Sequence, residues 1–184
     1  MEMKTTEPIR MEAGFMKDVA GRSGQMFNSC FHCRACSGGC PMGEEMDYLP
    51  NDIIRMVQLG LKQEVLESAS IWLCVGCLAC VSECPNGISI PEMMDTLRQV
   101  ALEEKAKIKE PEVVAFHQEF LGQVKRYGRL YELGFMTRYR MKSLPALRDI
   151  PNYMKFFFSG RLNFLPEKIH KRVDMKRLNE VCDV

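Results

Sequence analysis

A cysteine motif that occurs twice constrains this chain more than any other feature of its sequence. The segments 30–41 and 74–85 both read C-x₂-C-x₂-C-x₃-C-P, and the second begins 44 residues after the first. The two copies hold all but one of the 9 cysteines, and an odd number of cysteines cannot pair fully in disulfides within one chain. Thiols grouped this tightly are placed as metal ligands, so we expect both segments to bind metal through thiolates.

The spacing predicts two [4Fe–4S] clusters with exchanged ligands. Three cysteines on one short loop can grip a compact cubane, and the proline after the fourth cysteine keeps the chain from folding back. In two-cluster ferredoxins with this run, the fourth cysteine binds the other cluster. Zinc is the alternative, but a zinc site needs neither a third C-x₂ step nor a terminal Cys-Pro. The predicted ligand sets are Cys30, Cys33, Cys36 and Cys84 for the first cluster and Cys74, Cys77, Cys80 and Cys40 for the second.

Residues beside the cysteines are expected to shape the surroundings of the clusters. Glycines let backbone amides approach the sulfurs, and apolar side chains keep water away, and both effects tune the reduction potential. Gly76 is equally well explained as an ordinary loop glycine. The glycines in question are Gly38, Gly39 and Gly76, and the apolar side chains are Val75, Leu78, Ile88 and Ile90.

Three further side chains stand out, and we expect none of them to bind iron. His32 lies inside the first motif, but four cysteines already complete each cluster, so we expect it to have a local role. Trp72 precedes the second motif and is expected to anchor the core rather than to conduct electrons. Cys182, the cysteine outside the motifs, is expected to be an ordinary free thiol.

The hydrophobic pattern predicts an all-α fold. Apolar residues recur at helical spacing in several segments, and no segment shows the sustained alternation of a strand. We expect Gly128 and Gly134 to interrupt the chain, and four residues of proline or glycine make residues 143–166 irregular or only briefly helical. Helices are expected from a cap at Asn51 to Gly60, over residues 62–69, from Pro91 to about Lys109, and from Val113 to Arg126.

Charge divides the chain into parts with different expected roles. Residues 30–100 carry 4 basic and 9 acidic residues, whereas residues 111–184 carry 14 basic and 8 acidic ones. Basic and aromatic residues mix in the second part as they do at protein interfaces, and no nucleic-acid-binding motif accompanies them. We therefore expect an N-terminal extension over 1–29, a two-cluster ferredoxin-like domain over 30–110, and a basic partner-docking segment over 111–184.

Within the docking segment, two groups of residues have distinct expected places. The apolar side chains of Phe116, Phe120 and Leu121 are expected to be buried. A basic helical face is expected to meet the partner protein, and it comprises Lys168, Lys171, Arg172, Lys176 and Arg177.

The missing motifs narrow the function. The sequence holds no G-x-G-x-x-G, no P-loop and no nucleophile–base pair, so we expect an electron carrier rather than a complete enzyme. It also shows no apolar leader segment and no apolar run near the roughly 20 residues that a spanning helix needs. We therefore expect a cytoplasmic protein that meets neither membrane nor nucleic acid.

The duplicated motif, the helical insert between Pro41 and Cys74 and the extra C-terminal segment resemble the C-type iron–sulfur subunit of heterodisulfide reductase over about residues 20–150. The resemblance implies an α-helical ferredoxin fold in a soluble complex with two further proteins. These are an A-type subunit that carries flavin and iron–sulfur clusters and a catalytic B-type subunit with CCG domains. The resemblance also implies that electrons pass from the flavin through two [4Fe–4S] clusters to the catalytic protein, which reduces the coenzyme M–coenzyme B heterodisulfide in methanogens. A hydrogenase or a formate dehydrogenase would then supply the flavin-bearing protein.

The motifs leave two alternative functions open. They also look like the cluster domains of succinate dehydrogenase, glycolate oxidase and anaerobic glycerol-3-phosphate dehydrogenase, so the first alternative is the cluster subunit of such a dehydrogenase. We expect the heterodisulfide reductase protein because only 29 residues precede Cys30, too few for a [2Fe–2S] domain, and because no CCG domain follows. The second alternative is a non-catalytic structural or sensing iron–sulfur protein, against which the full set of cysteine ligands and the lack of an effector motif argue.

Overall fold

The structure is a computed structural model that describes residues 10–142. The chain divides into two compact units, Met1–Glu110 and Pro111–Val184. Every regular element among the described residues is helical and none is a strand, so the predicted all-helical character is confirmed for this range. The roles assigned above to residues 1–29, 30–110 and 111–184 stay predictions. No helix in the described range is both long enough and apolar enough to cross a membrane.

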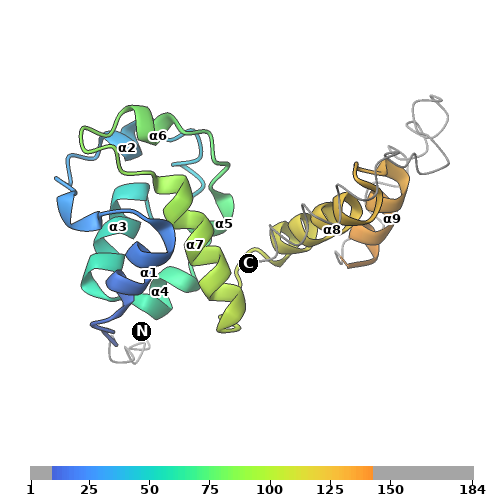
Figure 1. Cartoon of the computed structure of the whole chain (residues 1–184), viewed down its shortest axis with the longest axis horizontal. Helices are drawn as coiled ribbons and strands as arrows, with labels where there is room; N and C mark the ends of the chain where they lie inside the picture. Colours follow the sequence, from blue (N-terminus) through green and yellow to red (C-terminus); the bar gives the residue numbers. More distant parts are fainter. Residues whose placement is uncertain (1–9, 143–184) are drawn as a thin grey trace, which may run out of the picture. The chain divides into compact units, whose positions relative to one another are not determined.

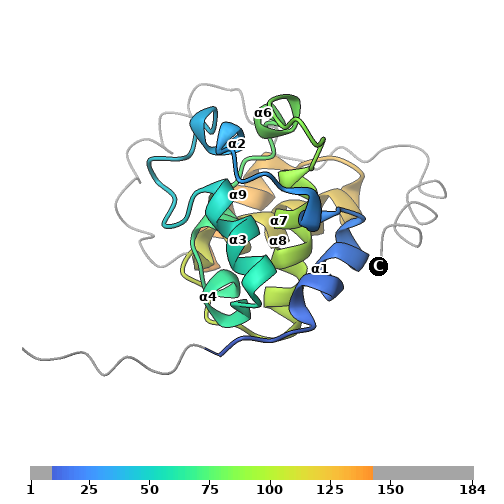
Figure 2. The same ribbon diagram turned by 90° about the vertical axis from the view of Figure 1, so that its left-hand side faces the viewer.

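The first unit is a group of packed helices with the two cysteine motifs at one end. Helices α1, α3, α4 and α7 pack against one another, and the short helices α2 and α6 of the two motifs lie side by side above them (Figures 1 and 2). The elements are α1 (Phe15–Ser23), the 3-10 helix η1 (Phe27–Ser29), α2 (Ala35–Gly38), α3 (Pro50–Leu59), α4 (Lys62–Leu66), α5 (Ser70–Leu73), α6 (Ala79–Ser82) and α7 (Ile90–Glu103).

The core of the first unit lies between α7 and its neighbours. Met93, Leu97 and Val100 recur along α7 at helical spacing and are almost fully buried. Helix α7 packs against α1, where Val19 is fully buried, and against α4 and α5. Since a fully buried aliphatic side chain stabilises a fold by about 1.5–3 kcal/mol relative to exposure, this core fixes the helices that carry the motifs.

Some helix ends differ from the predicted ones. Helix α3 begins at Pro50, whose fixed φ suits a first turn. Asn51, the predicted cap, is instead buried inside the helix, and its side-chain oxygen accepts a hydrogen bond from the Ser37 hydroxyl. The predicted stop at Gly60 is confirmed by its left-handed conformation. Helix α4 ends at Leu66 instead of residue 69, and α7 ends at Glu103 instead of near Lys109.

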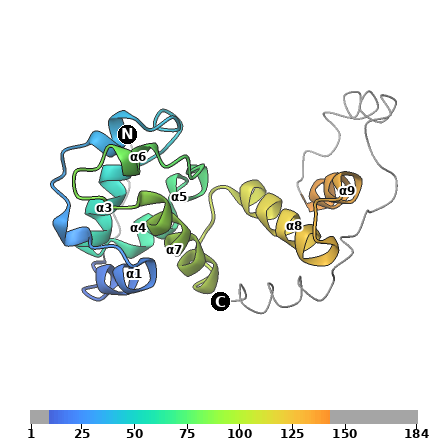
Figure 3. The same ribbon diagram turned by 45° about the horizontal axis from the view of Figure 1, so that its top comes forward.

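The second unit contains two helices in the described range, α8 (Pro111–Tyr127) and α9 (Glu132–Lys142), which pack against each other (Figure 3). Gly128 with φ 79° ends α8 as predicted, but Gly134 lies inside α9. The ring of Tyr131 occupies the space where a Cβ of residue 134 would lie, so glycine permits this close approach.

The apolar side chains of α8 are more exposed than predicted. Phe116, Phe120 and Leu121 are 42%, 37% and 55% exposed, so the prediction that they are buried is wrong. Phe116 packs edge-on against Phe135 of α9, with ring centroids 5.1 Å apart. A pair of helices offers one contact face, and the rest of an apolar helix surface stays open. The basic face predicted at residues 168–177, the irregular stretch 143–166 and Cys182 lie outside the described residues.

Candidate metal centre

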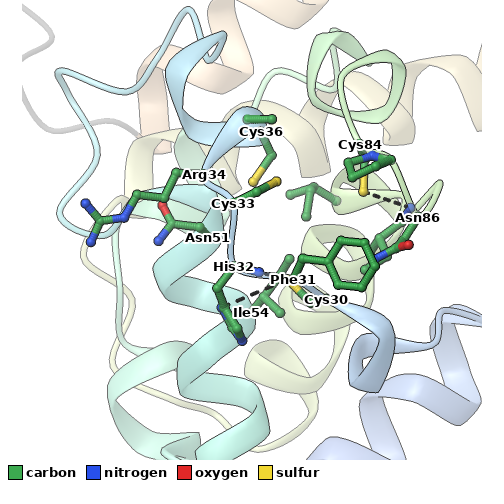
Figure 4. A pocket seen from close by; sticks show the side chains of 14 residues that line it. Cys30, Phe31, His32, Cys33, Arg34, Cys36, Asn51, Ile54, Cys84 and Asn86 are labelled. Carbon is green, nitrogen blue, oxygen red and sulfur yellow. Dashed lines mark hydrogen bonds between the residues drawn. The ribbon is translucent and has the colours of Figure 1, made fainter.

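Two hollows in the first unit are each lined by four cysteines. They have similar volumes of about 370 and 360 Å³, open solvent included. Figure 4 shows the first, in which Cys84 faces the three cysteines of the other motif. Each hollow combines the triplet of one motif with the last cysteine of the other. The first is lined by Cys30, Cys33, Cys36 and Cys84, and the second by Cys40, Cys74, Cys77 and Cys80.

The grouping of the thiols is therefore the grouping that the sequence predicts, while iron binding by them stays a prediction. The thiols stand around each hollow, and among the described residues no three His, Cys, Asp or Glu side chains converge on one single-ion position. A [4Fe–4S] cluster takes one thiolate on each of four irons, so four thiols spread around a hollow fit this group.

The two motifs fold alike as well as reading alike. His32 and Gly76, 44 residues apart, both have left-handed backbone, with φ of 53° and 62°. Arg34 and Leu78 form a second such pair, with φ of 64° and 65°. A left-handed conformation costs a residue with a side chain about 1–2 kcal/mol, so its retention at Arg34 and Leu78 indicates that the loop geometry is required.

Backbone amides reach the sulfurs in both hollows. The amide of His32 donates to Cys30 Sγ at 3.4 Å, and the amide of Ile88 donates to Cys84 Sγ at 3.4 Å. The amide of Gly76 hydrogen-bonds Cys74, which favours the first of the two explanations given above for this glycine. Such bonds favour a thiolate over a thiol and are one of the means by which proteins tune cluster potentials. The predicted amides of Gly38 and Gly39 instead bond to the carbonyls of Arg34 and Ala35.

Burial, with a smaller contribution from neighbouring thiols, favours the protonated form of three of the cysteines. Burial raises the pKa of Cys36 and of Cys74, and burial followed by the neighbouring thiols raises the pKa of Cys80 to about 11. Four thiolates around one hollow therefore need a compensating cation. A bound iron–sulfur cluster would supply that positive charge, and its binding would release the thiol protons, as expected for a thiolate metal site.

The apolar wall of the hollows is only partly the predicted one. Ile88 and Ile90 are 3% and 2% exposed and line the first hollow, which confirms their predicted role. Leu78 is 58% exposed and lines neither hollow, so its predicted place in a water-excluding shell is wrong, whereas Val75 lines the second hollow although it is 62% exposed. The triplet loops turn their outer side to solvent, and Phe31, which is 44 residues before Val75, is likewise 72% exposed.

The other side chains singled out from the sequence have local roles. Nδ1 of His32 lies 4.0 Å from Cys30 Sγ, and its Nε2 lies 2.9 Å from Gln58 Oε1. Trp72 is 5% exposed and forms part of the core, as predicted.

Asp47 and Arg98 hold the segment that leads into the second motif, and sequence reasoning did not identify either. Asp47 accepts hydrogen bonds from the amides of Ala69 and Ser70 at 2.9 and 3.0 Å, and so caps the start of α5. Arg98 of α7 donates to the carbonyl of Cys74 at the end of the same segment. A carboxylate 23 residues before the first residue of the helix that it caps leaves no periodic signal in the sequence.

We expect Asp47→Asn to lower the free energy of unfolding by about 1–2 kcal/mol at pH 7, the low end of the worth of hydrogen bonds to a charged group, because the Asp47 side chain is 26% exposed. Burial alone would raise the pKa of Asp47, but bonds from the Ser70 hydroxyl, Lys109 and two amides hold that pKa well below its usual range. The stabilisation is therefore present above the unfolded pKa near 4 and is lost as the pH falls further.

Urea unfolding of wild type and variant at several pH values measures this difference, which should shrink below about pH 4. Asp18→Asn is the control, because Asp18 is 48% exposed beside Arg22 and should cost well under about 1 kcal/mol. An Asp47→Asn loss that is equal at about pH 3 and pH 7 would show that the charge is not the cause.

Comparisons with known proteins agree with this site. Residues 26–88 match the 4Fe-4S dicluster domain family. The chain is 34% identical over 87 residues to the C-type iron–sulfur subunit of the CoB–CoM heterodisulfide reductase of Methanopyrus kandleri, covering 47% of this chain and 45% of the relative. It is 38% identical over 76 residues to a C-type iron–sulfur subunit, numbered 2, of the same reductase in Methanocaldococcus jannaschii, covering 41% of this chain and 40% of the relative.

A longer match has lower identity. The C2-type subunit of the H₂/formate:CoB–CoM heterodisulfide,ferredoxin reductase of Methanococcus maripaludis is 26% identical over 138 residues, covering 70% of this chain and 74% of the relative. For the relatives in Methanopyrus kandleri and Methanothermobacter thermautotrophicus, by contrast, the match spans less than half of the relative's length. The chain is thus a homologue of the C-type iron–sulfur subunits of CoB–CoM heterodisulfide reductases, with its cysteine motifs inside a 4Fe-4S dicluster domain match.

Proposed function

We propose that this chain is an electron-transfer protein that relays single electrons through two [4Fe–4S] clusters within a larger complex. The observation that carries the proposal is the pair of similar hollows, each lined by four thiols that come from both motifs. The proposed ligands are those given above for the two hollows. Bound there, the clusters would supply one-electron oxidation and reduction without any bond to substrate being made or broken.

The closeness of the hollows supports a relay. Ile90 lines both of them, so a single side chain lies between the two sites. Cys36 of the first hollow also contributes to the raised pKa of Cys80 in the second, which requires the two thiols to be near each other. Exchanged ligands join the two loops into one unit, and the chain's own task is to hold the sites close and partly dry.

The proposed partners follow from the resemblance to heterodisulfide reductase, since the names of the relatives place them only as C-type subunits of such complexes. We propose a complex in which an A-type subunit with flavin and iron–sulfur clusters donates electrons, and a catalytic B-type subunit with CCG domains accepts them to reduce the coenzyme M–coenzyme B heterodisulfide. A hydrogenase or formate dehydrogenase would feed the flavin-bearing protein. The exposed Phe116, Phe120 and Leu121 support a docking role for the second unit, because exposed apolar side chains this close together are typical of interfaces.

The alternative partners are distinguishable. A substrate-oxidising flavoprotein that co-purifies with the chain would favour a dehydrogenase of the succinate, glycolate or glycerol-3-phosphate type. A CCG-domain protein would favour a heterodisulfide reductase. A chain that purifies alone and passes no electrons would favour a structural or sensing role.

Iron content tests the cofactor part of the proposal. Protein prepared without oxygen should contain roughly eight iron and eight acid-labile sulfide per chain, because each full set of four thiolates holds one cubane. Colorimetric iron and sulfide assays, with zinc measured in the same sample, give the answer. Roughly four iron or fewer after anaerobic reconstitution, or stoichiometric zinc, contradicts two clusters.

A further inference from the structure

The segment just before each motif accepts a hydrogen bond from one side chain of a neighbouring helix, and the two donor side chains differ in charge. Gln58 of α3 donates from Nε2 to the carbonyl of Phe27 at 2.7 Å. Arg98 of α7 donates from Nε to the carbonyl of Ile71 at 2.5 Å. Phe27 and Ile71 each lie three residues before the first cysteine of a motif and are 44 residues apart. The two bonds are therefore equivalent contacts in the duplicated structure.

The helices confirm that the two positions correspond. Ile54 lines the first hollow and Met94 lines the second. Gln58 and Arg98 each lie four residues later, one turn along the same helix face. A neutral amide at the first site thus stands where a guanidinium stands at the second.

The charge of Arg98 is fixed close to the second hollow. A second guanidinium nitrogen donates to the carbonyl of Cys74 at 2.5 Å, and the side chain is 15% exposed. Its ion-pair partner Asp95 is 65% exposed, so solvent screens the carboxylate more than the guanidinium.

Unlike Arg98, the positively charged side chains near the first hollow are exposed to solvent. Arg34 lines it but is exposed, and its guanidinium points away from the thiols in Figure 4. Arg55 is also exposed and reaches only the side-chain oxygen of Gln58, at 3.4 Å. Charges in water are screened within about 10 Å at ordinary ionic strength, so neither matches Arg98.

We propose that Arg98 makes the cluster held by Cys40, Cys74, Cys77 and Cys80 the more easily reduced of the two. The inference rests on the proposed function. Reduction adds one negative charge to a cluster, and a fixed positive charge beside it stabilises the reduced form and raises its potential. An electron taken from a one-electron donor by the first cluster then passes to the second. The first is reoxidised, the second is reduced, and no proton or bond moves.

Potentiometric titration followed by EPR on the full-length, anaerobically reconstituted protein tests the inference. In the wild type the second cluster should be reduced first. Arg98→Gln, which copies the first site, should shift the electron distribution away from the second cluster roughly tenfold, about 59 mV for a one-electron couple. The potential of the first cluster should stay unchanged. Arg98→Lys keeps the positive charge and should retain most of the wild-type difference in potential between the two clusters.

The reciprocal variant Gln58→Arg should raise the potential of the first cluster, and it decides the matter if Arg98→Gln fails to load iron. A wild type that binds no clusters contradicts the proposed function itself. Clusters that load fully but keep their potentials in Arg98→Gln and Gln58→Arg overturn the inference alone. So does an equal shift of both clusters, which would indicate a change in net charge and no local effect.

Discussion

Cys84→Ser is expected to abolish the cluster bound by the triplet of the other motif and to leave the cluster of its own motif in place. Cys84 lines the hollow of Cys30, Cys33 and Cys36, while the rest of its own motif surrounds the second hollow. A serine hydroxyl is a poor iron ligand at neutral pH, so the cluster that loses this thiolate is lost or converted to a form with less iron. Iron should fall from roughly eight towards four per chain.

The reciprocal variant makes the test specific. Cys40→Ser should remove the cluster of Cys74, Cys77 and Cys80 and spare the other one. Cys182→Ser is the control for loss of a thiol outside the motifs and should retain both clusters. EPR of the reduced proteins separates the two signals. If each variant damages the cluster of its own triplet, the exchange of ligands is wrong.

The sequence predicted this grouping because the fourth cysteine of this run binds the other cluster in two-cluster ferredoxins, and because the loop that carries each triplet is set by local spacing. Fixed spacing of the cysteines sets the loop, and the structure repeats the left-handed backbone at residues 32 and 76 and again at 34 and 78. The helices were predictable for a similar reason, since apolar residues at helical spacing can be buried only if the segment is a helix.

The parts that the sequence did not predict depend on contacts between distant segments. Arg98 meets the carbonyls of Ile71 and Cys74, 27 and 24 residues before it in the sequence. The spacing of apolar or polar residues along the sequence does not predict such a hydrogen bond. The exposure of Val75 and Leu78 was missed because an apolar residue beside a cysteine reads as part of a core, although the loop turns it outward.

Gly60 joins the N-terminal segment to α3 at a point with no space for a side chain. Its φ of 72° is left-handed, and a Cβ there would lie 2.5 Å from the carbonyl oxygen of Glu12. Glu12 cannot easily move, because its amide donates to the Gly60 carbonyl at 2.8 Å and its own carbonyl accepts the amide of Phe15 at 3.1 Å. Phe15 starts α1, so the contact ties that helix to the end of α3.

We expect Gly60→Ala to lower the free energy of unfolding by about 2–5 kcal/mol, the sum of about 1–2 for left-handed backbone and about 1–3 for the forced contact. Gly24→Ala is the matched control, because Gly24 also ends a helix at φ 68° but has no atom within 4 Å of its would-be Cβ. It should cost only the backbone part. Anaerobic urea unfolding compares both variants with the wild type. Equal losses would mean that the Glu12 segment yields, so that the conformation of Gly60, and not the close approach, is what this position requires.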